Sequence, residues 1–172
     1  MKAETVLLVA AALLVVLALA VVAWQRARSG DGEGGESALG TWAADDPQLG
    51  RRAYALCLGC HGPEGRGIAG YAPPLAQAPW LNGDPRAAVL ITLHGFDATT
   101  EPGAPYYSSR MSGFHDRLAD HEIAALLSWA RQQWGNRAPP VERSLVGELR
   151  RRFAGRDRPW SPAELRAVVA AP

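Results

Sequence analysis

The chain has 172 residues, a length that allows one ordinary domain with appended segments. Its 18 basic residues are nearly balanced by 17 acidic residues, which argues against a nucleic-acid-binding protein, because such proteins usually carry a strong basic excess. The 13 prolines and 18 glycines indicate many loops, and an alternating β pattern is nearly absent, so we expect an all-α fold.

The first predicted element is an uncharged apolar segment that runs from Thr5 to Trp24. As a helix it would span about 30 Å, the hydrocarbon thickness of a bilayer. We therefore expect a transmembrane anchor over residues 1–28, with Trp24 at the membrane interface. A secretory signal is the alternative, because the Ala-Leu-Ala of residues 18–20 is a plausible cleavage site. Both alternatives export the rest of the chain.

Residues 29–40 are rich in glycine and acidic side chains, a composition that predicts a flexible linker. The folded domain is expected over residues 41–136. Its first helix should begin at Asp46-Pro47, an N-cap followed by proline, and should end near residues 59–62.

A long loop is predicted over residues 61–83, which contain four prolines. Such a loop inside a compact domain indicates a function or a ligand. A second helix should begin at Asp84 and cover residues 85–93, and Gly95 is a suitable C-terminal stop. The most regular helix is predicted over residues 120–134.

The last segment, residues 137–172, is a basic helical extension with eight arginines against four acidic residues. Its pattern predicts an amphipathic helix over residues 141–153. A second short helix should follow, because Ser161 and Glu164 have the spacing of a capping box.

The only two cysteines lie in the sequence CLGCH at residues 57–61. This pattern is typical of covalent haem c attachment, in which two thiols add to the porphyrin vinyl groups and the histidine approaches the iron. A zinc site would need four ligands, and there is no second cysteine pair. A thioredoxin-like dithiol needs a βαβ setting, and a disulfide over this spacing would be strained. An exported protein does not usually keep a free dithiol.

Five segments, taken in chain order, resemble class I c-type cytochromes. They are GRRAYALCLGCHG at 50–62, APPLA at 72–76, NGDPRAAVLITLHG at 82–95, RMSGF at 110–114 and LADHEIAALLSWARQQWGN at 118–136. The resemblance covers residues 45–136 and implies a compact helical domain around one covalent haem c. It also implies that Cys57 and Cys60 are the thioether anchors and that His61 is the proximal iron ligand.

The same resemblance implies that Met111 is the distal ligand. Apart from Met1 it is the only methionine, and it lies 50 residues after His61. Ser112 follows it where family members often have proline, a change that loosens the loop in principle. Ordinary core packing is the non-functional interpretation of Met111. The other candidate ligands are three histidines, of which the second is the most serious: His94, His115 and His121.

Family members use a backbone carbonyl to accept a hydrogen bond from the other ring nitrogen of the proximal histidine, and we expect Pro73 to supply it. Leu75 should pack against the haem. Trp80 should either donate to a haem propionate or only pack.

The resemblance also implies a close crossing of the first and last helices of the domain. Gly50 and Tyr54 would lie at this crossing, against Leu126 and Trp129. Ala119 replaces the serine that commonly caps the last helix, at a cost of roughly 1 kcal/mol unless Asp120 takes over.

These features together predict a non-enzymatic single-electron carrier with one low-spin haem c and His/Met axial ligands. It would act in a bacterial respiratory or dehydrogenase chain, with redox proteins and the membrane as partners, and without nucleic acid or a small-molecule substrate. Alternatives are a dedicated cytochrome subunit of a membrane dehydrogenase or haem–copper oxidase, and a haem peroxidase or gas sensor with an open distal site.

The expected location is the bacterial cytoplasmic membrane, crossed once, with the haem domain on the periplasmic face. If the first segment is a cleaved signal, the protein is soluble in the periplasm instead.

Overall fold

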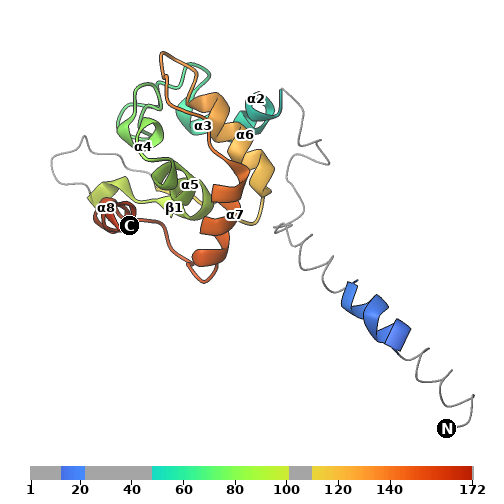
Figure 1. The fold of residues 1–172 in the computed structure, drawn as a ribbon. Helices are drawn as coiled ribbons and strands as arrows, with labels where there is room; N and C mark the ends of the chain where they lie inside the picture. Colours follow the sequence, from blue (N-terminus) through green and yellow to red (C-terminus); the bar gives the residue numbers. More distant parts are fainter. Residues whose placement is uncertain (1–12, 22–47, 101–109, 172) are drawn as a thin grey trace, which may run out of the picture. The chain divides into compact units, whose positions relative to one another are not determined.

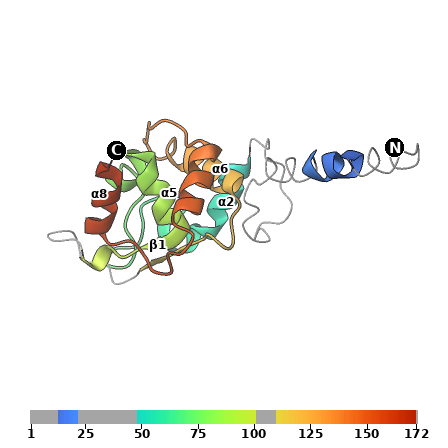
Figure 2. The ribbon, with the colours of Figure 1, turned by 60° about the horizontal axis from the view of Figure 1, so that its bottom comes forward.

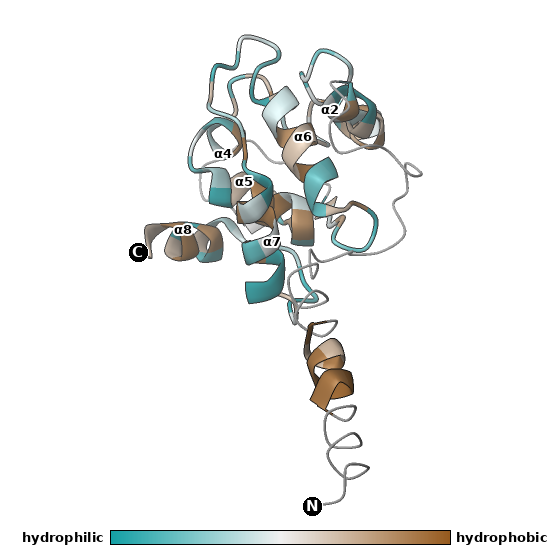
Figure 3. Ribbon diagram, turned by 45° about the vertical axis from the view of Figure 1, so that its right-hand side comes forward, coloured by the Kyte–Doolittle hydropathy of each residue, from teal (hydrophilic) through white to brown (hydrophobic). Residues whose placement is uncertain are grey.

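The computed structural model describes residues 13–21, 48–100 and 110–171. The chain divides into two compact units, Met1–Gly32 and Glu33–Pro172. In the first unit, residues 13–21 form a helix with exposed leucine and valine side chains, which is strongly hydrophobic in Figure 3. Within the described residues, no helix has the length and apolar character needed to cross a membrane. The rest of the predicted anchor, the predicted linker and Asp46-Pro47 lie outside the described residues.

The described part of the second unit is mainly helical, as the sequence predicts. Its elements are α2 (Leu49–Ala53), η1 (Tyr54–Leu56), α3 (Leu58–His61), α4 (Pro79–Asn82), α5 (Pro85–His94), β1 (Gly95–Phe96), η2 (Ala98–Thr100), β2 (Met111–Ser112), α6 (Asp120–Ala130), α7 (Arg143–Arg152) and α8 (Pro162–Ala170). Figures 1 and 2 show α5 in the middle of this unit, between α7 and α8. The two strands are only two residues long each and pair antiparallel.

The predicted first helix is not continuous: a 3₁₀ turn, η1, separates α2 from α3. Its predicted end is correct, because Gly62 follows α3 with a φ of +67° and turns the chain away. The predicted loop over residues 61–83 is irregular for most of its length. It also contains the short helix α4, which the sequence analysis did not predict.

Helices α2 and α6 cross closely at Gly50. A Cβ at this position would lie 2.6 Å from Trp129 Cβ and would also collide with the carbonyl of Ala125. The Tyr54 ring packs against the Trp129 ring with centroids 5.0 Å apart. The predicted crossing is therefore present, although Ala125 and not Leu126 makes the closest backbone approach to Gly50.

The caps of the two long domain helices differ from each other. Asp84 accepts a hydrogen bond from the Arg86 N–H at 2.8 Å and caps α5 as predicted. At α6, Ala119 has no capping side chain, and the Glu122 carboxylate accepts from the Ala119 N–H at 2.8 Å. Asp120 does not replace the missing cap, because it forms an ion pair with Arg150.

Helix α6 ends at Ala130, earlier than the predicted residue 134. The carbonyl of Ala130 accepts from Asn136 Nδ2 at 2.9 Å and from the Gln133 N–H at 3.2 Å, while Trp134 adopts a φ of +53°. The Trp134 indole N–H then donates to Pro63 O at 2.9 Å. The apolar periodicity of the sequence extends to Trp134. In the structure, however, Trp134 has left the helical conformation, and its side chain contacts the Pro63 segment.

The C-terminal extension shares the core of the domain. Its two predicted helices are present, and the capping box is confirmed by Ser161 Oγ, which accepts from the Glu164 N–H at 3.3 Å. Five of its apolar residues belong to the same buried cluster as α5 and α6: Val141, Val146, Leu149, Trp160 and Leu165.

A buried arginine joins the extension to the helical domain. Arg131 is 1% exposed and donates to Pro139 O at 2.7 Å, to Gly83 O at 3.2 Å and also to Leu81 O. Because these carbonyls lie on both sides of the domain boundary predicted at residue 137, one side chain connects the two segments.

We predict that Gly50→Ala lowers the free energy of unfolding by roughly 1–3 kcal/mol, because the added Cβ overpacks the α2–α6 crossing. Chemical denaturation of the holoprotein measures this loss. The control is Gly155→Ala, where an added Cβ meets nothing within 4 Å. Equal stability of the Gly50→Ala variant and the native protein would show that the crossing tolerates a larger separation.

Candidate functional site

The short helix α3 presents the two cysteines and the histidine of the CLGCH motif. Cys57 is partly buried just before the helix, Cys60 is exposed and His61 is 7% exposed. Burial, together with the neighbouring Cys60, raises the pKa of the Cys57 thiol to about 12. The Cys57 sulfur is thus available in its neutral thiol form at neutral pH.

His61 makes one polar contact that defines its chemistry. Its Nδ1 lies 3.0 Å from the backbone oxygen of Pro73, at hydrogen-bonding distance. Burial lowers the pKa of His61, while the bond to Pro73 opposes this effect. In a neutral imidazole whose Nδ1–H donates to Pro73 O, Nε2 carries a free lone pair and can bind a metal.

One backbone hydrogen bond holds the loop that carries Pro73 against α3, and another joins two parts of the loop to each other. Gly67 N–H donates to His61 O at 3.0 Å, and Leu75 N–H donates to Gly65 O at 2.7 Å. Gly67 has a φ of +69°, and a Cβ there would lie 2.6 Å from Pro73 O. Glycine at this position therefore lets the Pro73 carbonyl approach the imidazole.

An apolar cavity of about 400 Å³ connects these residues with the rest of the domain. Cys57, Cys60 and His61 line it, and so does Met111. The remaining lining is mostly aliphatic and aromatic and includes Leu56, Leu75, Trp80, Ile91, Phe96 and Leu127. Two thiols, an imidazole and a thioether in a cavity of this character fit a haem, which needs covalent anchors, axial donors and an apolar lining.

Met111 reaches the cavity from β2. In the β1–β2 ladder, Phe96 pairs with Met111 and Gly95 pairs with Ser112. Gly95 has a φ of +87°, and a side chain there would collide with the Met111 carbonyl. After the strand, Phe114 N–H donates to Thr92 O at 2.9 Å. The backbone at Met111 and after it is therefore tied to α5 and its continuation.

The other histidines are placed differently. His94 is buried, its ring stacks on the His115 ring at 5.8 Å, and burial is the main cause that lowers its pKa. His121 lies in the first turn of α6. None of these three side chains is among the described residues that line the cavity, whereas Met111 is.

Three further residues that the sequence analysis singled out, Pro73, Leu75 and Trp80, all line the cavity. The Trp80 ring packs edge-on against Phe96 at 5.5 Å and lies under the Arg166 guanidinium at 5.4 Å. These contacts show Trp80 packing within the protein.

The sequence analysis missed two arginines that line the cavity. Arg110 forms an ion pair with Asp97 at 2.8 Å, and the Arg117 guanidinium lies 4.5 Å from the centre of the Phe114 ring. Their only signal in the sequence is proximity to Met111. Two cations at a cavity that accepts haem are suited to its carboxylate groups.

Comparison with known proteins agrees with this geometry. The family model for cytochrome c matches residues 47–134, about half of the chain. The chain belongs to the cytochrome c family. This cytochrome is therefore an electron carrier with covalently bound haem c and not an enzyme in itself, and the resemblance inferred from the sequence is confirmed.

Its relatives include both single proteins and subunits of larger enzymes. It is 36% identical over 91 residues to cytochrome c-552 of Thermus thermophilus, covering 51% of this chain and 69% of that protein. It is 34% identical over 95 residues to cytochrome c4 of Azotobacter vinelandii, covering 53% and 42% of the two chains. It is also 33% identical over 100 residues to the gluconate 2-dehydrogenase cytochrome c subunit of Pantoea cypripedii, covering 56% of this chain and 22% of the subunit.

Proposed function

We propose that this cytochrome carries single electrons through one low-spin haem c with His61 as the proximal and Met111 as the distal ligand. The observation that carries the proposal is that the CLGCH motif and Met111, from separate segments, line one apolar cavity. When bound, haem c supplies reversible one-electron chemistry at its iron. A thioether ligand favours Fe(II) and gives a higher potential than a second histidine would.

In this proposal each residue of the cavity has a defined task. Cys57 and Cys60 form the thioether bonds, and Pro73 O orients the His61 imidazole and increases its basicity. Leu75 and Trp80 exclude water by packing. A peroxidase or gas sensor requires an open distal position, which a bound Met111 side chain would close.

Met111→Ala tests the distal ligand. We expect the ferric Fe–S charge-transfer band to disappear, the reduction potential to fall and the ferrous protein to bind carbon monoxide, because the distal position becomes open. Absorption spectroscopy and a redox titration of the holoprotein measure these changes. His115→Ala, which removes the strongest alternative ligand, should leave the band and the potential unchanged. A band that survives Met111→Ala would refute the assignment.

Gly67→Ala tests the hydrogen bond between His61 and Pro73. The new Cβ should displace the Pro73 carbonyl, weaken the bond and make the imidazole a poorer donor to Fe(III), so we expect a higher reduction potential. The overpacking should also cost roughly 1–3 kcal/mol of stability.

The matched control is Gly70→Ala. Gly70 lies in the same loop with a φ of +71°, but a Cβ there meets nothing within 4 Å. It reproduces the backbone strain without displacing Pro73 O. Equal potentials of the two variants would show that this carbonyl does not tune the iron.

We also propose the predicted organisation around the haem domain. Residues 1–28 would anchor the chain in the bacterial cytoplasmic membrane, residues 29–40 would act as a linker, and the domain of residues 41–136 with the basic extension of residues 137–172 would face the periplasm. The uncharged segment from residue 5 to residue 24 supports this proposal. Cleavage of the segment would give a soluble periplasmic protein.

The partners we propose are membrane dehydrogenases, oxidases or other cytochromes. A specific observation supports the role of a dedicated subunit: the gluconate 2-dehydrogenase subunit and the alcohol dehydrogenase (quinone) cytochrome c subunit of Gluconobacter oxydans are both relatives. Exposed Leu58, Ile68 and Tyr71, near the exposed Cys60 in the chain, offer an apolar contact for such a partner.

Solubilisation of native membranes tests both proposals together. We expect the haem-bearing polypeptide in the membrane fraction, released only by detergent, and eluting in size-exclusion chromatography with a dehydrogenase or oxidase polypeptide. A chain that lacks residues 1–28, exported with a cleavable signal, serves as the control and should be released without detergent. Recovery of the full chain in the soluble periplasmic fraction would contradict the anchor, and elution as a single polypeptide would contradict the subunit role.

A further inference from the structure

The C-terminal extension is joined directly to the strand that pairs with Met111. Trp160 N–H donates to Gly95 O at 3.0 Å, and Asp97 N–H donates to Trp160 O at 2.8 Å, which makes a parallel bridge between Phe96 and Trp160. Because β1 also pairs with β2 through Phe96 and Met111, β1 has the methionine strand as one neighbour and the extension as the other.

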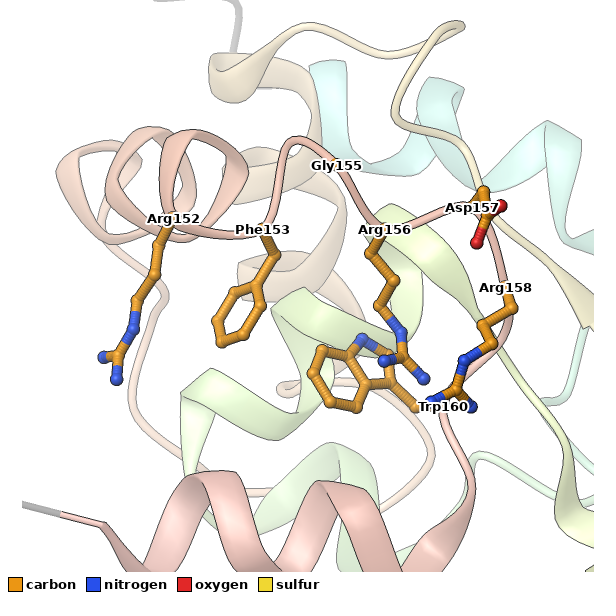
Figure 4. A pocket seen from close by; sticks show the side chains of 7 residues that line it. All are labelled: Arg152, Phe153, Gly155, Arg156, Asp157, Arg158 and Trp160. Atoms are coloured by element: carbon orange, nitrogen blue, oxygen red, sulfur yellow. The ribbon is translucent and has the colours of Figure 1, made fainter.

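Trp160 is held in place by contacts within the extension itself. Its side chain is 3% exposed and meets the Phe153 ring edge-on at 5.2 Å. The Arg156 guanidinium covers the indole at 3.6 Å from the ring centre and bonds to Glu164 at 3.0 Å. Figure 4 shows Arg156 and Phe153 next to the indole. The bridge to β1 therefore comes from a residue that also packs against other side chains of the extension.

A second attachment comes from α7 and holds the segment that follows Met111. Arg150 Nε donates to Asp120 at 2.6 Å, Nη2 donates to Leu118 O at 2.7 Å and Nη1 donates to His115 O. The Arg150 side chain is 13% exposed, so solvent screens these charge-assisted bonds only partly. The extension thus restrains the strand beside Met111 and the chain after it.

The methionine segment needs such restraint. A two-stranded ladder of two residues per strand has little stability of its own. Ser112 allows more backbone conformations than the proline that often follows this methionine in related sequences. The attachments from the extension therefore add to the restraint that the β1 ladder and the bond from Phe114 N–H to Thr92 O give to the Met111 segment.

We propose that the C-terminal extension is a clamp that keeps Met111 on the iron, with Trp160 and Arg150 as its positioning residues. This proposal rests on the proposed His61/Met111 ligation. Exogenous imidazole reaches the ferric iron only when the thioether has left, so its binding rate measures how often the Met111 segment opens. Loosening either attachment should raise that rate.

The experiment measures imidazole binding to the ferric holoprotein by stopped flow, together with the Fe–S charge-transfer band. We expect Trp160→Ala and Arg150→Gln each to accelerate binding about tenfold or more, the effect of losing a charge-assisted hydrogen bond or a buried aromatic anchor. The band should weaken in both variants. Trp160→Phe, which keeps an aromatic side chain, should restore most of the native rate, and Arg151→Ala, an exposed arginine on the same helix, should leave it unchanged.

Gly50→Ala separates a local effect from a general loss of stability, because it weakens the α2–α6 crossing and leaves the extension intact. At a comparable loss of unfolding free energy it should accelerate imidazole binding much less than Trp160→Ala. Equal acceleration of imidazole binding in Gly50→Ala and Trp160→Ala would overturn the clamp. A native binding rate in Arg150→Gln would also overturn it, and this variant decides the outcome if Trp160→Ala fails to fold. Absence of the Fe–S band from the native protein would instead refute the proposed Met111 ligation.

Discussion

The described domain depends on the connection between His61 and the Pro73 carbonyl across a long, irregular loop. The 3.0 Å contact sets the tautomer in which Nε2 is a free donor, and it holds the wall of the cavity that carries Pro73 and Leu75. The loop can make this contact only because Gly67 lets its backbone approach closely. Its otherwise unusual length is explained by the cavity that it encloses.

The C-terminal extension is part of the hydrophobic core of the domain. Its composition suggests a basic appendage, yet Val146, Leu149 and Leu165 are buried in the same cluster as α5 and α6. Its two half-buried arginines bind within the unit: Arg150 binds Asp120 and two backbone carbonyls, and Arg156 binds Glu164 and the indole of Trp160. These two side chains therefore stabilise packing, whereas the other six arginines of the segment are exposed.

The differences between the expected and observed elements have common physical causes. Helix α5 and the capping box of α8 follow local rules, because their caps lie within three residues of the groups that they bind. The predicted end of α6 at residue 134 was wrong, because the Trp134 indole N–H donates to Pro63 O, 71 residues away in the chain. The sequence also offered Asp120 as a cap for α6, but the Asp120 carboxylate forms an ion pair with Arg150 from α7 instead.

The sequence alone determined the haem-binding motif, the family and the candidate ligands. The CLGCH pattern can be read directly from the order of residues, and Met111 is the only methionine apart from Met1. Only the tertiary structure decided that Met111 lines the cavity while His94 and His115 stack together outside its lining. The bridge from Trp160 to β1 was likewise invisible in the sequence. Such contacts join residues far apart in the chain, and their formation depends on the packing of whole helices and not on any local pattern.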